Sequence, residues 1–236
     1  MLTVELRRLG LGAGGHALDL GCGRGRHAHA LATLERVDVI AFDRNPEDLH
    51  HTAEGFAYFG LDRAQGWSVL AGDALALPFP DAAFDCVICA EVLEHLPDFE
   101  TALNEIARVV RPGGVFALSV PRAWPERICW ALSEDYRTEP GGHVRVFNAR
   151  ALRAAVVARG FRPTGRHGAH ALHSPYWWLR CAVGARKADD NPLVRGYRKF
   201  LEWDLMQRPV ATRALEALLN PVLGKSVAMY FAREAA

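Results

Sequence analysis

The chain reads Ala17-Leu-Asp-Leu-Gly-Cys-Gly-Arg-Gly-Arg-His-Ala28 near the start of its sequence. This order is typical of a short apolar strand, a glycine-rich turn and the beginning of a helix. Gly21, Gly23 and Gly25 have no Cβ, so the backbone of the turn can take positive φ and approach a ligand closely. Because free N–H groups and the positive end of the helix would face that ligand, the turn predicts a nucleotide-like cofactor.

Two side chains indicate which nucleotide is bound. Dinucleotide enzymes usually carry GxGxxG after the first strand, whereas Arg26 stands here in place of the third glycine. Asp19 adds a carboxylate at the end of the strand. A carboxylate would repel a pyrophosphate but would attract an ammonium or a sulfonium group. The motif therefore favours a cofactor with a cationic amino-acid moiety over a nicotinamide dinucleotide.

Three further strands are expected downstream. The strand at 37–43 ends in Asp43, about twenty residues beyond the glycines, and its two oxygens suit the hydroxyls of a ribose. The alternative is that Asp43 caps a helix beginning near Asn45. Asp73 follows a strand at 69–71 and could accept a hydrogen bond from the adenine amine. The strand at 84–90 has almost no polar residue, as expected when both faces of a sheet are covered.

The combined motifs resemble class I S-adenosylmethionine-dependent methyltransferases, of the branch that includes the ubiquinone and menaquinone biosynthesis methyltransferases. The resemblance covers roughly residues 15 to 165. It is carried by LDLGCGRG at 18–25, Asp43, GDALALPFPDAAFDCVICAEVLEHL at 72–96 and RPGGVFALS at 111–119.

The resemblance implies S-adenosylmethionine as cofactor and assigns residues to it. Asp19, Gly21, Gly23 and Gly25 would hold its methionine part, Asp43 its ribose, and Asp73 and Ala74 its adenine. Glu91 would lie near the sulfonium end. The full expected set of cofactor-binding residues is Asp19, Gly21, Cys22, Gly23, Gly25, Asp43, Arg44, Asp73, Ala74 and Glu91.

Composition limits the class of protein and its partners. The chain has 236 residues and a formal net charge of +1, from 28 basic and 27 acidic residues. This length suffices for one well-buried α/β domain, and the balanced charge does not recruit nucleic acid. The five cysteines are odd in number and scattered, and we see neither a signal segment nor an apolar run of membrane-spanning length. We therefore expect a cytoplasmic protein; its oligomeric state is not predicted.

The expected fold is a three-layer, Rossmann-like α/β sandwich. Its sheet would have seven strands, mostly parallel, with an antiparallel last strand at 225–233. We also expect a lead-in helix at 3–11, a helix beginning at Glu91, helices at 101–110, 149–158 and 212–219, and a sixth strand at 161–168. A single domain would then comprise a core of about 1–169 and 225–236 and a helical insertion of about 170–224. The insertion is interpreted as a cap over the substrate side; a thicker core or a dimer face is the alternative.

The reaction expected of this cofactor is an in-line displacement, for which the enzyme mainly aligns acceptor and methyl group in a dry site. A hydroxyl acceptor would also have to lose a proton, and histidine is the usual base near neutral pH. His143, in a loop after the fifth strand, and His95, after the fourth, are the candidate bases. Tyr136, Arg145 and Trp177 are candidate substrate-binding residues.

A metal site is not predicted. His167, His170 and His173 recur at every third residue, but on a strand that spacing sends side chains to opposite faces, and no Cys or acidic residue lies nearby in the sequence. A helix would improve the geometry.

The sequence predicts methyl transfer to a small-molecule, partly apolar acceptor, with O- or C-methylation favoured over N-methylation. Base-flipping amine methyltransferases often carry an Asn-Pro-Pro-Tyr-like tetrapeptide after strand four, which is missing from Cys89-Ala-Glu-Val-Leu-Glu. Aromatic residues in the insertion would also permit transient contact with a membrane surface. The alternatives are a non-catalytic S-adenosylmethionine sensor or partner subunit and, less favoured, an NAD-dependent oxidoreductase.

Overall fold

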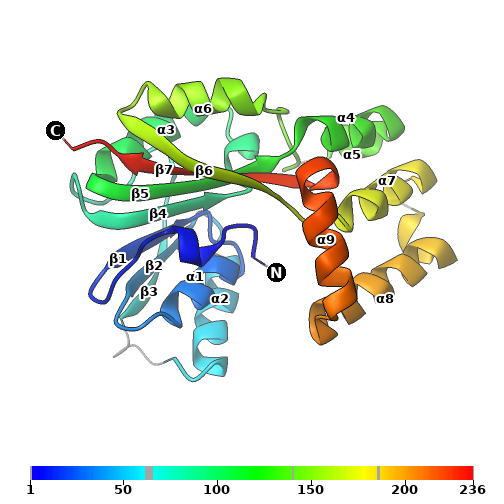
Figure 1. Ribbon diagram of the computed structural model, residues 1–236, viewed down its shortest axis with the longest axis horizontal. Coiled ribbons are helices and arrows are strands. Elements are labelled where there is room, and N and C mark those ends of the chain that lie inside the picture. Colours follow the sequence, from blue (N-terminus) through cyan, green and yellow to red (C-terminus); the bar gives the residue numbers. More distant parts are fainter. Residues whose placement is uncertain (1, 62–65, 140, 185–186, 236) are drawn as a thin grey trace.

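The computed structural model describes residues 2–61, 66–139, 141–184 and 187–235. Its centre is a seven-stranded sheet in the order β3-β2-β1-β4-β5-β7-β6 (Figure 1). Only β7 runs antiparallel to its neighbours, β5 and β6. The strands are β1 His16–Leu20, β2 Asp38–Asp43, β3 Trp67–Ala71, β4 Phe84–Ala90, β5 Val110–Pro121, β6 Phe161–Ala169 and β7 Ser226–Arg233.

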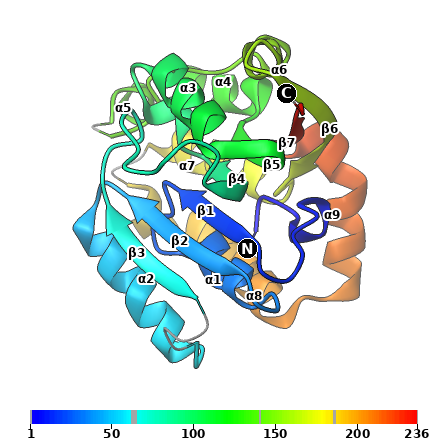
Figure 2. The same ribbon diagram turned by 90° about the vertical axis from the view of Figure 1, so that its left-hand side faces the viewer.

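Helices cover both faces of the sheet, which makes three layers (Figures 1 and 2). One face packs on α3 and α6, through residues such as Ile106 and Leu152, and the other packs on α1 and α2, through residues such as Leu31 and Phe56. Successive strand residues serve opposite faces. The helices are α1 Arg26–Ala32, α2 Pro46–Tyr58, α3 Phe99–Val109, α4 Ala123–Leu132, α5 Glu134–Thr138, α6 Ala149–Val157, α7 His173–Val183, α8 Pro192–Gln207 and α9 Val210–Leu223, with short 3-10 turns η1 Leu6–Arg8, η3 Leu93–His95 and η4 Ala188–Asp190.

The strand order places the functional region. The chain leaves β1 towards β2 on one side, and β4 pairs with β1 on the other. Connections diverge at this point, so a crevice opens beyond the carboxyl ends of β1 and β4. Open α/β sheets bind ligands in such crevices. The glycine turn after β1 and the segment after β4 therefore meet at one edge of the sheet.

The expected fold class is confirmed, including the antiparallel last strand. Three expected helices were wrong in detail. Residues 3–11 form only the single turn η1. No helix starts at Glu91, because its φ is +58° and η3 intervenes before α3. Helix α9 does not stop at residue 219 but continues through Pro221, whose missing N–H costs one hydrogen bond near the last turn.

The segment between β6 and β7 forms α7, η4, α8 and α9 at one end of the molecule (Figure 1). It has a small apolar cluster of its own, made of Leu172, Tyr176, Ala188, Val194 and Leu201. No helix of the described residues is long and apolar enough to cross a bilayer.

Phe231 tests the core beneath β7. It is fully buried, and its ring stacks on Phe116 of β5 with centroids 6.0 Å apart. Phe231→Ala should lower the free energy of unfolding by about 3–5 kcal/mol, because the cavity it leaves cannot close completely. The measurement is denaturant unfolding. Tyr58→Ala is the control: Tyr58 is 86% exposed, so its loss should change stability by about 0.5 kcal/mol or less. Equal effects would contradict this account of the core.

Candidate active site

The glycine turn after β1 has the backbone that the sequence suggested. Gly21, Gly23 and Gly25 have φ of +71°, +49° and +77°. A Cβ on Gly21 would lie 2.3 Å from Cγ2 of Val92, so the segment after β4 packs directly on the turn. Gly25 is the N-cap of α1, whose first N–H groups therefore start at the turn. The turn is a preformed cradle for a ligand at the helix N-terminus.

Asp43, at the end of β2, secures this turn. One carboxylate oxygen accepts the N–H of Gly23 at 2.8 Å, and the other accepts the N–H of Asn45 at 2.9 Å. The hydroxyl of Thr52 donates to the carbonyl of Gly23 at 2.8 Å. The N-cap of α2 is Asn45, whose side chain accepts from Glu47, so Asp43 is not the helix cap. Its remaining lone pairs are available to a ligand.

A cavity of about 590 Å³ lies against this turn. Seven of the ten expected cofactor-binding residues line it: Gly21, Gly23, Asp43, Arg44, Asp73, Ala74 and Glu91. Glu91 accepts a hydrogen bond from the hydroxyl of Ser119 at 2.7 Å, which orients its carboxylate. The polar ends of β2, β3 and β4 thus converge on one cavity.

The other three expected residues, Asp19, Cys22 and Gly25, do not line the cavity wall. Asp19 is 1% exposed and accepts the N–H of Ala28 at 2.8 Å. Burial raises the pKa of Asp19 to about 7. Cys22 is buried, and Gly25 packs against Thr52 and His29. These three residues support the turn on the side away from the cavity. Direct contact of Asp19 with a cationic ligand stays a prediction.

Replacing Asp43 tests the cofactor site. Asp43→Ala should weaken S-adenosylmethionine binding by about 1.5–3 kcal/mol, because charge-assisted hydrogen bonds are lost. Calorimetric titration measures this, with thermal unfolding as a check on folding. Asp38→Ala, at the exposed opposite end of the same strand, is the matched control and should bind normally. Unchanged affinity of the Asp43 variant would remove Asp43 from the site.

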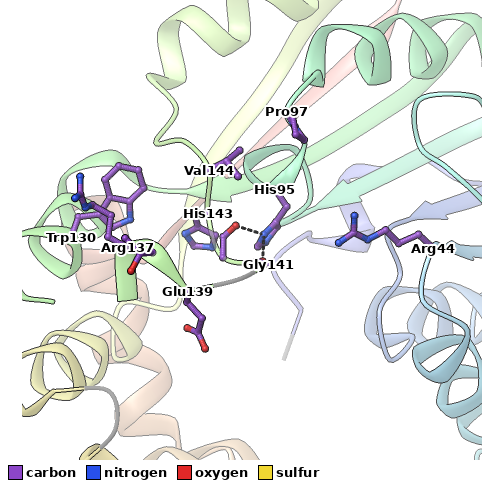
Figure 3. Close-up of a pocket in the computed structure, with 11 residues that line it drawn as sticks. Arg44, His95, Pro97, Trp130, Arg137, Glu139, Gly141, His143 and Val144 are labelled. Carbon is purple, nitrogen blue, oxygen red and sulfur yellow. Dashed lines mark hydrogen bonds between the residues drawn. The ribbon is translucent and has the colours of Figure 1, made fainter. Parts of the chain in front are cut away.

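Figure 3 shows a second cavity, of about 660 Å³. It adjoins the first, because Arg44, His95 and Gly141 line both cavities. His143 and Trp130 lie only in the second, so both candidate bases face this cavity. A molecule bound here would be next to one bound at the glycine turn, which is the arrangement that group transfer requires.

His143 is held by a buried carboxylate. Its Nδ1 lies 2.6 Å from Oε1 of Glu126, which is on α4 and 1% exposed. Burial alone would raise the pKa of Glu126, but the hydrogen bond with His143 and the charge of Lys225 outweigh it and lower that pKa. In the tautomer with the proton on Nδ1, His143 donates a hydrogen bond to Glu126 and has a lone pair on Nε2.

Glu94 and His95 complete the group. Nε2 of His143 lies 4.0 Å from Oε1 of Glu94. Glu94 is 1% exposed, and neither carboxylate oxygen has a hydrogen-bond partner in the described part of the chain. Burial, reinforced by the charge of Glu91, raises the pKa of Glu94 well above its ordinary value. Nδ1 of His95 lies 2.9 Å from the carbonyl of Gly141 (Figure 3), so its Nε2 also carries a lone pair.

These three side chains have the donor set of a metal site, although none was predicted. One ligand atom each of Glu94, His95 and His143 lies within 4.8 Å of the others. Both histidines have Nδ1 fixed by an oxygen acceptor, as metal-ligating histidines do. The unpartnered oxygens of Glu94 fit the same interpretation, because buried polar atoms are rarely unpaired.

The three expected substrate-binding residues do not line the second cavity. Arg145 donates to the carbonyls of Leu96 and Pro97, at 2.8 and 2.6 Å, and so fixes the segment after β4. The hydroxyl of Tyr136 donates to Glu126 at 3.4 Å. Trp177 packs on Tyr136, with ring centroids 5.8 Å apart. All three side chains contact other groups of the protein around the cavity, and so they support its wall.

Sequence reasoning missed Glu126, Glu94 and Lys225. Lys225 precedes β7, and its Nζ lies 3.5 Å from Glu126. Arg127 follows Glu126 and Glu91 lies three residues before Glu94, so neither carboxylate stands out in the sequence, and an acidic residue within Ala-Trp-Pro-Glu-Arg-Ile-Cys-Trp was the only available signal. Charged residues are rarely buried without a partner, so Glu126 could have been questioned.

Comparison with known proteins agrees with this geometry. Residues 18–118 match the family model of the methyltransferase domain. The 27-O-demethylrifamycin SV methyltransferase of Amycolatopsis mediterranei is 36% identical over 170 residues, 72% of this chain and 62% of that protein. The sterol 24-C-methyltransferase of Eremothecium gossypii is 32% identical over 139 residues, 59% of this chain and 34% of that protein. The chain thus spans only part of these relatives.

The fold also recurs among solved structures. A protein of Bacillus halodurans C-125, described as a methyltransferase, superimposes with a TM-score of 0.66 at 20% identity, covering 98% of this chain and 97% of that one. At this identity the similarity shows the fold alone. It agrees with the three layers and the strand order described above.

Proposed function

We propose that this chain, whose residues 18–118 match the family model of the methyltransferase domain, is a class I S-adenosylmethionine-dependent enzyme that transfers a methyl group to a small-molecule acceptor. S-adenosylmethionine supplies a methyl group already activated by sulfonium charge. The chain contributes the glycine turn, Asp43 and Asp73 for binding, and the adjoining cavity for the acceptor. The observation that supports this most strongly is the shared wall of the two cavities, at Arg44, His95 and Gly141.

The acceptor is proposed to be partly apolar and to react at oxygen or carbon. Trp130, Pro97 and Val144 line the second cavity together with the polar groups of Arg137 and His143. The named relatives act on a sterol and on a rifamycin. Because these relatives act on different kinds of molecule, the proposed acceptor is not limited to quinone precursors, although quinone precursors stay within the proposal. A sensor or partner subunit without turnover is the alternative, and acceptor-dependent release of S-adenosylhomocysteine distinguishes it from an enzyme.

For a hydroxyl acceptor, His143 is the proposed base. Its Nε2 lone pair can accept the acceptor proton, and Glu126 stabilises the imidazolium that forms. His95 lies beside it, with ring centroids 5.0 Å apart. Burial and the neighbouring His143 lower the pKa of His95. His95 is therefore neutral at pH 7 and does not compete with His143 for the acceptor proton.

Replacing Glu126 tests this pair. Glu126→Gln should lower kcat by about 10²-fold or more with a small change in KM, because the amide cannot stabilise a protonated His143. Steady-state kinetics with an accepted hydroxyl substrate measures both constants. Glu139→Gln is the matched control, since Glu139 lines the same cavity and is exposed. An equal loss in both variants would exclude a specific role for Glu126.

A divalent cation is the second way in which this site can activate an acceptor. The unpartnered oxygens of Glu94, beside two histidines with Nε2 lone pairs, are the observation that favours it. A cation bound there would lower the pKa of an acceptor hydroxyl. In that case Glu94, His95 and His143 act as ligands and Glu126 orients His143.

Chelation separates the two mechanisms. If the cation operates, dialysis against EDTA should lower kcat by about tenfold or more, and Mg²⁺, Mn²⁺ or Zn²⁺ should restore it. Glu94→Gln should abolish the restoration without preventing S-adenosylmethionine binding. Full activity after EDTA would exclude the cation and leave His143 as the base.

Contact with a membrane surface is proposed for the insertion, in an otherwise cytoplasmic protein. None of the residues of α9 is fully buried, and Met206 and Leu218 are 77% and 74% exposed. Arg195, Lys199, Arg208 and Arg213 of α8, α9 and their connection carry no ion pair within the described residues. Apolar side chains flanked by unpaired cations fit an anionic lipid interface.

Vesicle sedimentation tests this contact. The protein should bind vesicles of phosphatidylcholine with phosphatidylglycerol, and the double change Met206→Glu and Leu218→Glu should abolish binding. Tyr58→Glu, on the exposed part of α2, is the control and should bind normally. Binding that is absent, or insensitive to the double change, would remove the lipid surface as a partner.

A further inference from the structure

A second group of potential ligands lies outside both cavities. It consists of His170, just after β6, His173, the first residue of α7, and Glu216 on α9. A ring nitrogen of each histidine and a carboxylate oxygen of Glu216 lie within 4.8 Å of one another. The end of β6 and the helices α7 and α9 meet in this corner of the molecule (Figure 1).

The two histidines do not lie on one strand, because β6 ends at Ala169 and His173 begins a helix. An acidic residue also lies close in space, since α9 brings in Glu216 from more than forty positions away in the sequence. The fold therefore assembles a donor set that residue spacing could not show.

Unpartnered polar atoms are concentrated in this corner. Nδ1 of His173 and Oε1 of Glu216 are buried, and neither has a hydrogen-bond partner among the described residues. Oδ1 of Asp204, on α8, is also buried without a hydrogen-bond partner among the described residues. The charge of Asp204 favours a higher pKa for both His173 and Glu216, so Asp204 lies near them. Most buried polar atoms in proteins are paired, so three together call for an explanation such as a bound ion.

The backbone and ring of His170 are also constrained. Its φ is +64°, which is uncommon for a residue other than glycine. Oγ1 of Thr3 lies 3.1 Å from its Nε2 and so orients the ring. Outer partners of this kind hold the histidines of metal sites in place.

We propose that His170, His173 and Glu216 bind a divalent transition metal, with Zn²⁺ the best match, and that Asp204 supports this site. Two imidazoles with a carboxylate are a usual zinc donor set, whereas Mg²⁺ and Ca²⁺ prefer oxygen ligands. This site is separate from Glu94, His95 and His143 and does not depend on the proposed methyl transfer.

The ion would have a structural task. Helix α9 has no fully buried residue, so apolar burial holds it only weakly to the rest of the protein. Coordination by Glu216 would add to the two hydrogen bonds that already join α9 to the β6–α7 junction, from the N–H of Ala171 to Asn220 and from the hydroxyl of Ser174 to the carbonyl of Leu223. The backbone N–H of Thr3 also donates to Nε2 of His27 in α1, at 3.3 Å. The ion would thus connect the insertion, through Thr3, to the helix that starts at the glycine turn.

Zinc binding by full-length variants tests the proposal. The measurements are made in a Glu94→Gln background, which removes a ligand of the other candidate site. After metal removal, competition with a chromophoric chelator should show one Zn²⁺ per chain, and zinc should raise the midpoint of thermal unfolding. His173→Asn and Glu216→Gln should each weaken binding by at least about tenfold and remove the thermal shift.

The exposed pair of His50 and Glu54 on α2 supplies the matched control. These side chains lie 3.2 Å apart, and Glu54→Gln should leave zinc binding unchanged. Circular dichroism confirms that each variant is folded. A metal-free protein that takes up no zinc, or folded His173→Asn and Glu216→Gln variants that bind it as tightly as their parent, would overturn the proposal. Calorimetry with S-adenosylmethionine on the same samples reports separately on the proposed function.

Discussion

The carboxylate of Asp43 is the contact on which the cofactor region depends. It accepts N–H groups from Gly23, in the turn after β1, and from Asn45, at the start of α2. Two connections of the sheet are thereby joined by one side chain at the end of β2. A glycine turn alone would be mobile, because glycine restricts its backbone least. The anchoring by Asp43 selects one conformation of the turn and holds its N–H groups ready for a ligand.

A second organising feature is the buried charge around His143. Glu126 from α4, Glu94 from η3 and Lys225 before β7 come together although they are far apart in the sequence. Bringing these charges out of water is costly unless each finds a partner. Glu126 is in contact with His143, Tyr136 and Lys225. Glu94 has no hydrogen-bond partner among the described residues, and its charged neighbour His143 lies 4.0 Å away. This imbalance makes Glu94 the most informative residue of the group.

Much of the fold could be predicted because local signals agreed with the global pattern. The bounds of β4 were predicted to the residue, since an uninterrupted apolar run bounded by turn residues has few alternatives. Seven of the ten residues expected to bind the cofactor line one cavity, because strand ends of a parallel sheet share one edge, and cofactor binding there stays a prediction. The supporting roles of Tyr136 and Arg145, and the two groups of potential metal ligands, could not be predicted. They depend on how α4, α7 and α9 pack, and no local pattern encodes that packing.

The register of the sheet has a consequence for the history of the molecule. Ala169, the last residue of β6, pairs with Ser226, the first of β7. The intervening helices therefore leave and rejoin the sheet at neighbouring points, as a hairpin loop would. Chain closure across such a gap depends only weakly on loop length. Descendants of one ancestor can thus exchange, lengthen or shorten this segment while the half that carries the glycine turn stays intact. Under the proposed function, this is a simple route to new acceptor preferences.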